Sequence, residues 1–319
     1  MPIIRSLNIE DTEVYREQLI QYIYERNINN VHMELYNFKD AEVEYRELLS
    51  YFHDDKAIMY GAIEQNKLIG FIYAYQYPFR DDISRIYISI LYVDKEYRSR
   101  HIGKNLLRKI ENYAQKIKVR AVYLHTEAFN TDVVKFYQRN GYEIERIQMI
   151  KNVEKKSIEI IDWTQDIRGE IYELREADIK RNELDLVNLF LMNTKAHILA
   201  DCFDQKWAEE KIKDLQGYVA ENKAIAYGFL YKEELVGFIW VFPYSYKGEK
   251  RYLLNALTVL PKYRGKGIAD ILFQTVEKRI EEKGLSLYLL VDKANERAYS
   301  FYKKHGMKDE LFQYVKYIN

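Results

Sequence analysis

The apolar and polar residues form a series of strand-like and helix-like patterns, and the same series occurs twice along the chain. In the first half, two alternating, strand-like runs at 57–64 and 67–77 flank a two-residue turn, and a strongly apolar run covers 85–93. Apolar positions then recur at helical spacing over 102–117, and a short apolar run at 121–126 precedes a second helix. The order strand–helix–hairpin–strand–helix–strand–helix–strand predicts an α/β (α+β) sandwich with a mixed sheet.

The second half repeats these elements. Each half opens with a short strand and a polar helix start, at Asn8 in the first half and near Asp178 in the second. The last helix of each half ends before a glycine, Gly141 or Gly306, which predicts a left-handed C-cap. A final strand is expected to close each copy. In the second half, a helix is predicted at 268–280. Strands are predicted at 171–174, 224–231, 234–242, 251–259 and 285–291.

The two copies stay in register, which indicates a duplicated domain. Gly228 lies 167 positions after Gly61, and Arg264 lies 166 positions after Arg98. Unrelated segments would not keep this spacing, and two copies of such a long period are too few for a solenoid. We therefore expect two tandem domains that form a pseudo-dimer, at 1–152 and 170–319, with a charged connector at 153–169 that can itself form a strand.

Composition narrows the function classes. Lys+Arg and Asp+Glu both number 49, so no overall charge favours nucleic acid or an anionic membrane as a partner. The single cysteine, Cys202, excludes an internal disulfide and a cysteine-based metal site, and it fits a reducing cytoplasm. No signal peptide or membrane-spanning run is evident. We expect a soluble cytoplasmic protein without a metal, either a monomer or a weak homo-oligomer.

The strand-to-helix turn of the second copy carries the clearest chemistry. Small residues at such a turn leave backbone N–H groups pointing outward at the positive end of a helix dipole, which makes a phosphate cradle. Basic side chains add mobile positive charge around it. The turn reads Arg264-Gly265-Lys266-Gly267-Ile268-Ala269.

The surrounding sequence extends this motif to a family resemblance. A Leu257-x-Val259 strand precedes the turn, and the spacing Asn295-x-x-Ala298-x-x-Phe301-Tyr302-x-x-x-Gly306 follows it. The chain here resembles the GNAT superfamily of acyl-CoA N-acyltransferases, whose acyl-CoA signature is Gln/Arg-x-x-Gly-x-Gly/Ala. The resemblance covers nearly all of both copies. It implies a GNAT-like fold and an acyl-CoA cofactor, acetyl-CoA above all, with no metal.

The resemblance also implies roles for single residues. The pyrophosphate would sit on the amides of Gly265–Ala269, and the pantetheine would pair with the backbone near Leu257 and Val259. The Leu257 amide, with Leu91 as its counterpart, would bond the thioester carbonyl, where a fixed N–H stabilises the developing negative charge. The corresponding cofactor-binding residues of the first copy are Val93, Arg98, Ser99, Arg100, His101, Ile102, Gly103 and Asn130.

Proton transfer needs further groups. Tyr302 and Tyr137 match the family's general acid, which protonates the departing thiolate, although each could instead only pack against its helix. Asn130 and Asn295 can cap their helices and can also lie near the pantetheine. We hold both interpretations for these asparagines.

No general base is evident from the sequence. Many relatives carry a Glu on the central strand, where this chain has Ser89 and Asn255. Candidates are His125 and Glu127 in the first copy and Asp292 in the second, and a water relay is the alternative.

The first copy departs from the signature at one position, where His101 replaces the first glycine. A side chain is tolerated there if the backbone keeps a helical φ, because the phosphate donor is the amide. The remaining matches favour retained cofactor binding, with a lost or weakened site as the alternative.

These observations predict an acyl-CoA-dependent N-acyltransferase that transfers acetyl to a primary amine on a small molecule, a peptide or a protein. The second copy keeps the more intact signature and is the expected catalytic copy. The alternatives are one catalytic and one non-catalytic domain, or an interaction module without chemistry. Aminoacyl or long-chain acyl transfer is disfavoured, because tandem relatives of that kind lack the phosphate-binding signature.

Overall fold

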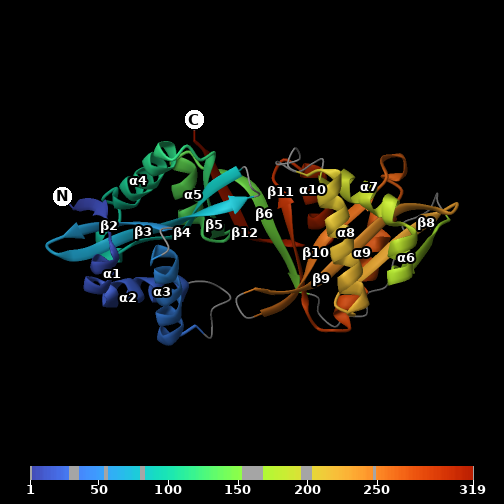
Figure 1. Cartoon of the computed structure of the whole chain (residues 1–319), viewed down its shortest axis with the longest axis horizontal. Coiled ribbons are helices and arrows are strands. Elements are labelled where there is room, and N and C mark those ends of the chain that lie inside the picture. Colours follow the sequence, from blue (N-terminus) through green and yellow to red (C-terminus); the bar gives the residue numbers. More distant parts are fainter. Residues whose placement is uncertain are drawn as a thin grey trace. The chain divides into compact units, whose positions relative to one another are not determined.

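The chain forms two compact units in its computed structural model (Figure 1). Unit 1 comprises Met1–Ile144 and Leu311–Asn319, and unit 2 comprises Glu145–Glu310. Cys202 and nearly all of the expected connector lie outside the residues that the structure describes. The described residues are 2–28, 36–53, 57–79, 83–152, 168–194, 203–246 and 249–318.

Unit 1 is built on one mixed sheet with strand order β1-β2-β3-β4-β5-β12. Strands β4 and β5 are parallel, and the other neighbours in this sheet are antiparallel. The strands and the helices after the hairpin follow the order predicted for an α/β sandwich, whereas three helices, not one, precede the hairpin. Its elements are β1 (Ile3–Ser6), α1 (Ile9–Val14), α2 (Arg16–Asn27), α3 (Phe38–His53), β2 (Ala57–Glu64), β3 (Lys67–Phe79), β4 (Ile83–Val93), the 3-10 turn η1 (Lys95–Tyr97), α4 (Ile102–Lys116), β5 (Ala121–Glu127), α5 (Thr131–Arg139) and β12 (Lys308–Tyr317).

Unit 2 repeats this architecture with strand order β6-β11-β10-β9-β8-β7. Strands β10 and β11 are its parallel pair, and the other neighbours are antiparallel. Its elements are β6 (Glu143–Asn152), β7 (Glu170–Glu173), α6 (Glu176–Arg181), α7 (Glu183–Thr194), α8 (Gln205–Ala220), β8 (Ile225–Tyr231), β9 (Glu234–Tyr246), β10 (Glu249–Val259), the 3-10 turn η3 (Pro261–Tyr263), α9 (Ile268–Glu281), β11 (Ser286–Asp292) and α10 (Glu296–Lys304).

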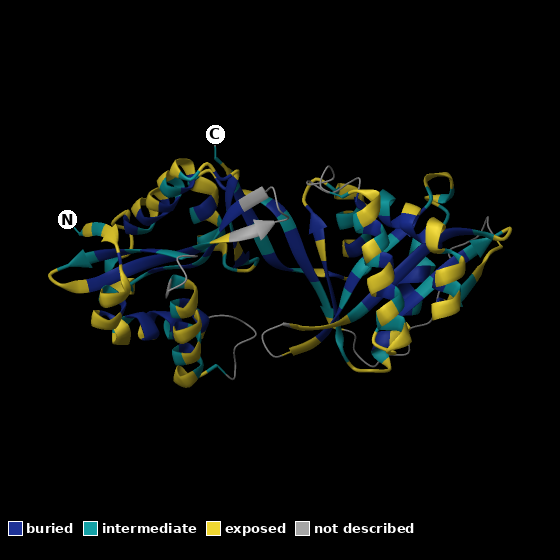
Figure 2. Cartoon of the chain, viewed as in Figure 1, coloured by how far each residue is buried: buried dark blue, intermediate teal, exposed yellow. Residues whose placement is uncertain are grey.

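Helices bury both faces of each sheet. In unit 1, α4 and α5 pack on one face and α2 and α3 on the other, each with its own apolar cluster. In unit 2, α6, α7 and α8 share a cluster with one face of the sheet. The buried residues accordingly follow the central strands and the inner sides of the helices (Figure 2).

Local signals in the sequence were accurate for turns and caps. Asn8 accepts from the Asp11 amide and caps α1, and Asp11 returns a bond to the Asn8 amide. Gln65 and Asn66 both have positive φ, as the hairpin turn between β2 and β3 requires. Gly141 ends α5 with φ +79°, and Gly306 ends α10 with φ +80°. The predicted left-handed C-caps are therefore confirmed.

The final strand of each copy does not close its own copy, and that expectation is wrong. Strand β6 of the first copy pairs with β11 in unit 2, and β12 of the second copy pairs with β5 in unit 1. The sheets of the two units are similar, so the alternating apolar pattern of a closing strand fits the edge of β5 and the edge of β11 equally. The period therefore does not specify which sheet the strand joins.

The same polar clamp holds each exchanged strand. Lys151 of β6 donates to Glu277 Oε1 at 2.5 Å and to the carbonyl of His305 at 2.7 Å. Lys316 of β12 makes the matching pair of bonds in unit 1, to Glu111 at 3.0 Å and to the carbonyl of Asn140 at 2.9 Å. Both clamps bring a lysine to the C-terminal end of a helix, where its charge is favourable.

Candidate active site

The central parallel strands of unit 2 separate halfway along their length. Strands β10 and β11 pair from Arg251 with Ser286 to Leu253 with Tyr288, and then part. The register of β10 against β9 shifts between Leu254 and Ala256, which leaves Asn255 as a bulge residue. The sheet thus opens a gap between the C-terminal halves of its two middle strands.

The backbone of β10 presents Leu257 and Val259 to this gap. The Leu260 amide donates to the Val236 carbonyl of β9 at 2.8 Å, so by alternation the groups of Thr258 also face β9. Leu257 and Val259 then face away from β9, and Arg264 Nε donates to the outward carbonyl of Val259 at 2.9 Å.

Unit 1 repeats this backbone arrangement. The Asp94 amide donates to the Ile69 carbonyl of β3 at 3.0 Å, which turns Leu91 and Val93 away from β3. Arg98 Nε donates to the Val93 carbonyl at 3.0 Å. The arginine that opens each signature is therefore fixed by the end of the preceding strand.

The glycine turn of unit 2 has the form of an anion cradle. Gly265 and Gly267 have φ +78° and +79°, and Gly267 is the N-cap of α9. The first bond of the helix runs from the Ile271 amide to the Gly267 carbonyl at 3.1 Å, so the amides of 268–270 have no acceptor within the helix. No side chain of the described residues caps this end.

Two guanidinium groups stand beside the cradle. Arg264 and Arg297 both line the same cavity. Burial, together with the positive charge of Arg297, holds the pKa of Arg264 below its ordinary value. An anion placed between them would relieve this repulsion.

The turn of unit 1 corrects one expectation about His101. Its φ is +60°, in the left-handed region, rather than helical, and Ser99 before it has φ +65°. The N-cap position of α4 demands this conformation as it does for Gly267, and a side chain there is strained. Arg100 in this turn forms an ion pair with Glu64 at 3.1 Å.

Gly103 lies close to the Phe136 ring in unit 1. A Cβ at this position would lie 3.3 Å from the Phe136 ring. Its neighbour Ile102 is 2% exposed and anchors the first turn of α4 in the core. Ile268 takes the same place in α9 and is 1% exposed.

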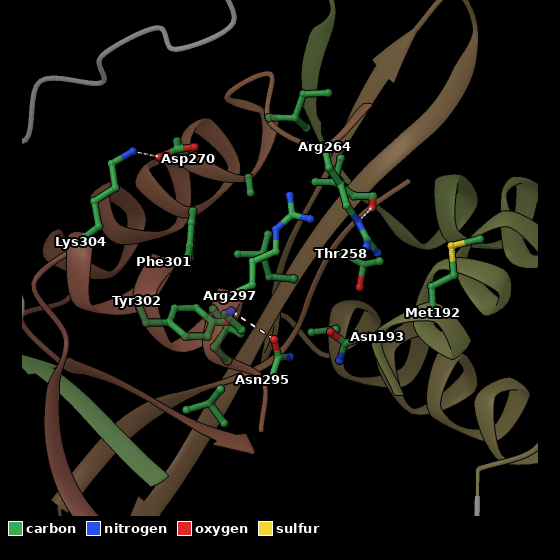
Figure 3. A pocket seen from close by; sticks show the side chains of 18 of the residues that line it. Met192, Asn193, Thr258, Arg264, Asp270, Asn295, Arg297, Phe301, Tyr302 and Lys304 are labelled. Atoms are coloured by element: carbon green, nitrogen blue, oxygen red, sulfur yellow. Dashed lines mark hydrogen bonds and ion pairs between the residues drawn. The ribbon is translucent and has the colours of Figure 1, made fainter. Parts of the chain in front are cut away.

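These features of unit 2 meet in one cavity of about 490 Å³ (Figure 3). Most residues predicted for this site are brought together there, whereas Lys266 lies in the turn but does not line the cavity. Sequence reasoning missed a second group of lining residues, which come from α7, the interior of β10 and the first turns of α9 and α10. The predicted lining residues are Leu257, Val259, Arg264, Gly265, Gly267, Ile268, Ala269, Asn295 and Tyr302, and the missed ones include Met192, Asn193, Thr258, Asp270 and Arg297.

Tyr302 extends from α10 into this cavity (Figure 3). The Met307 amide donates to the Tyr302 carbonyl at 3.0 Å in the C-terminal cap of the helix. The side chain is buried, and burial raises the pKa of its hydroxyl above the ordinary value. Tyr137 has the same position in α5, with the Tyr142 amide bonded to its carbonyl and a pKa raised by burial.

Both motif asparagines cap their helices. Asn130 Oδ1 accepts from the Val133 amide at 3.3 Å, and Asn295 Oδ1 accepts from the Ala298 amide at 3.1 Å. The capping interpretation is therefore confirmed. Asn295 also lines the cavity.

The candidate bases differ in their surroundings. Asp292 lines the cavity of unit 2 and pairs with Arg146 Nε at 3.0 Å. His125 is exposed, with its Nδ1 3.5 Å from the Tyr87 hydroxyl. Glu127 is half-buried. Burial raises the pKa of Tyr87 and of Tyr137, and the charge of Glu127 raises both further.

Comparison with known proteins identifies the family. The sequence profile of the acetyltransferase (GNAT) family matches residues 25–142 and again 193–307. The chain belongs to this family. It is a tandem GNAT protein, and GNAT proteins in general bind acyl-CoA and transfer acyl groups.

Solved structures agree on the fold. A GCN5-related N-acetyltransferase from Sphaerobacter thermophilus superposes with a TM-score of 0.62 at 16% identity, covering 100% of this chain and 96% of that one. A tandem GNAT protein from the clavulanic acid biosynthesis pathway gives a TM-score of 0.52 at 11% identity, covering 100% and 99%. A comparison with curated proteins found no match. Of the helices that the structure describes, none combines the length and apolarity needed to cross a bilayer.

Proposed function

We propose that unit 2 of this GNAT protein transfers an acetyl group from acetyl-CoA to a primary amine by direct attack. One observation carries the proposal. A single cavity joins the uncapped start of α9, the outward backbone of Leu257 and Val259, and the side chain of Tyr302. These are the three parts that the reaction needs: an anion cradle, a donor for the thioester oxygen and a proton donor for the sulfur.

The residues present fit acyl-CoA. The amides at the start of α9 would hold the pyrophosphate, with Arg264 and Arg297 beside it. Their mutual repulsion would be relieved by a diphosphate, because its charge has the opposite sign. The pantetheine amides would pair with the backbone that β10 turns away from β9.

Bond changes in the transfer balance with these groups. The amine nitrogen forms a bond to the thioester carbon and the carbon–sulfur bond breaks, while the Leu257 amide would stabilise the carbonyl oxygen. The thiolate would take the proton of Tyr302, whose raised pKa keeps the phenol protonated at neutral pH. The proton released by the amine would leave through water or Asp292, which lines the cavity.

A second candidate function is that only unit 2 is catalytic, and one contact in unit 1 favours it. Arg26 Nη2 donates to the carbonyl of Ser89, the bulge residue of β4, at 3.0 Å, and its Nη1 donates to Glu44 at 3.1 Å. A guanidinium of the chain itself therefore occupies the bulge where unit 2 has open cavity. This observation, with the strained His101, favours a structural or acyl-CoA-binding role for unit 1.

Two matched tyrosine variants test the assignment. Tyr302→Phe is expected to lower kcat about 100-fold, because general acid catalysis contributes about 10²–10⁴-fold. Tyr137→Phe in unit 1 is the control and should leave kcat within about twofold. Turnover is measured as CoA release from acetyl-CoA with a panel of amines.

Three outcomes separate the alternatives. A large effect of Tyr137→Phe alone would move catalysis to unit 1. No effect of either variant would show that neither phenol is the general acid. Calorimetry of the whole protein with acetyl-CoA tests the step before chemistry, and absence of binding would support an interaction module instead.

A further inference from the structure

The cavity of unit 2 continues through the sheet to the face that α7 covers. The bulge at Asn255 exchanges the two faces of β10, so Ala256 pairs with Trp240 and Thr258 pairs with Phe238. Trp240, Phe238 and Ala256 belong to the apolar cluster under α7 and α8. The side chain of Thr258 therefore lies on the α7 side of the strand.

Two residues of α7 complete this end of the cavity. Met192 and Asn193, in the last turn of the helix, line the same space as Thr258 and Asn255 (Figure 3). We call these four residues the α7 end of the cavity. The Tyr302 ring lies 6.0 Å from that of Phe273 in α9, and the side chains of Ile268 and Val259 meet at Gly237, so α9 and Tyr302 pack on the other side of β10.

The α7 end contains polar atoms that lack partners. Thr258 is 4% exposed, and its Oγ1 is buried with no hydrogen-bond partner in the described part of the chain. Asn255 Nδ2 is likewise buried and without a partner there. Such atoms cost stability unless something bonds them, so each points to a ligand group. The amide nitrogen is a donor only, and it requires an oxygen or another acceptor on that ligand.

Unit 1 closes the corresponding space. Tyr92 pairs with Phe71 in the same register as Thr258 with Phe238, and its hydroxyl donates to the carboxylate of Glu25. Tyr22 stacks on Tyr92 with ring centroids 4.7 Å apart. The threonine and methionine of unit 2 stand where unit 1 has a tyrosine and a glutamate, and this smaller pair leaves the opening.

Charge around the cavity disfavours a polycationic ligand. The carboxylates among the described lining residues are Asp270 and Asp292, and both are ion-paired. Asp270 binds Lys304 at 2.8 Å, and Asp292 binds Arg146 at 3.0 Å. The α7 end itself has only neutral side chains, so recognition there would use hydrogen bonds rather than ion pairs.

We propose that the α7 end is the acceptor subsite, and that it selects amines carrying a neutral oxygen, a hydroxyl or a carbonyl, within a few bonds of the reacting nitrogen. This rests on the proposed function of unit 2. Leu257, whose amide is assigned to the thioester oxygen, lies between Asn255 and Thr258 in β10. A ligand that bonds these two side chains therefore holds its nitrogen next to the thioester carbon.

Matched amine probes test the selection. CoA release is measured at saturating acetyl-CoA with D-glucosamine against cyclohexylamine, with glycinamide against ethylamine, and with putrescine, at equal concentrations of unprotonated amine. The oxygen-bearing member of each pair is expected to have about tenfold higher kcat/KM, as one or two hydrogen bonds give. Equal rates within the pairs, a preference for putrescine, or no acetylation of the oxygen-bearing amines by a protein that binds acetyl-CoA would overturn the proposal.

Variants at the subsite give a second test. Thr258→Val removes the hydroxyl at constant shape and should raise KM for the preferred amine about three- to tenfold, while Thr258→Ser should retain it. Thr258→Tyr installs the residue of unit 1 and should abolish amine use with acetyl-CoA affinity retained. Tyr92→Phe in unit 1 is the matched control, with no change in KM.

The readouts separate this inference from the proposed function. Failure of the wild-type protein to bind acetyl-CoA in calorimetry would contradict the proposed function itself. Normal binding and turnover with KM unchanged in Thr258→Val would contradict only the acceptor subsite.

Discussion

At the scale of single residues, equivalent positions in the two units carry different chemistry. Thr258 and Tyr92 share one place in the sheet, yet the first lines a cavity and the second bonds Glu25. Gly267 and His101 share one backbone conformation, which is easy for glycine and strained for histidine. The two units therefore agree more closely in backbone than in these side chains.

The protonation of Tyr302 sets an expectation for pH. The ordinary tyrosine pKa is 10.0, and burial raises the pKa of Tyr302 above it. A general acid acts in its protonated form, and a raised pKa moves the loss of that form to higher pH. In unit 2, kcat at saturating substrates should therefore not fall through titration of this group below about pH 10. A pH–rate profile checks this, and an alkaline limb near pH 8 that disappears in Tyr302→Phe would contradict it.

The sequence predicted the residues of contiguous motifs and missed those that converge from elsewhere. Val259, Arg264 and Tyr302 could be predicted from the sequence because their spacing matches a family pattern. Met192 and Thr258 gave no such signal, since a methionine on a helix and a threonine in a strand are ordinary core residues. Only the bulge and the parting of β10 from β11 bring them to one cavity.

At the scale of elements, helix ends carry most of the local constraints. Helices α5 and α10 begin at an asparagine cap and end at a left-handed glycine. Their tyrosines, Tyr137 and Tyr302, lie in the last turn, where the cap fixes the backbone. Helices α4 and α9 instead begin without a side-chain cap among the described residues, so their first amides have no acceptor within the helix.

Two alanine substitutions measure the constraint at the start of α9. Gly267→Ala places a Cβ at φ +79° and should lower the free energy of unfolding by about 1 kcal/mol. Gly217→Ala in α8 is the matched control, because its Cβ would meet nothing within 4 Å. A helical alanine there should raise the free energy of unfolding by about 0.5–1 kcal/mol. Urea denaturation checks both values, and equal stabilities would contradict the strain argument.

At the scale of the whole molecule, sequence halves and folded units differ at the closing strands. Each unit is completed by a strand from the other copy, and a lysine clamp holds each strand. The sequence predicted the elements and their order because apolar periods are local. It did not predict the exchange, because pairing with either of two similar sheets satisfies the same period.

A rearranged chain tests which segment completes unit 1. Residues 1–144 joined through a short glycine–serine linker to 311–319 contain all strands of that unit. We expect this chain to unfold cooperatively, whereas residues 1–144 alone lack both β12 and nearly all of β6 and leave the edge of β5 unpaired. Thermal unfolding by circular dichroism and size-exclusion chromatography check the difference. A monomeric, cooperative 1–144 beside an unfolded rearranged chain would contradict it.

The position of β12 after the segment of unit 2 in the sequence has a consequence during protein synthesis. The first 144 residues of unit 1 leave the ribosome long before the strand that pairs with β5. Translation of residues 145–310 at about 5–20 residues per second takes on the order of 10–30 seconds. Throughout that interval β12 has not been made, so on polysomes the edge of β5 can pair with other strands, including β6 of the same copy, before its final partner exists.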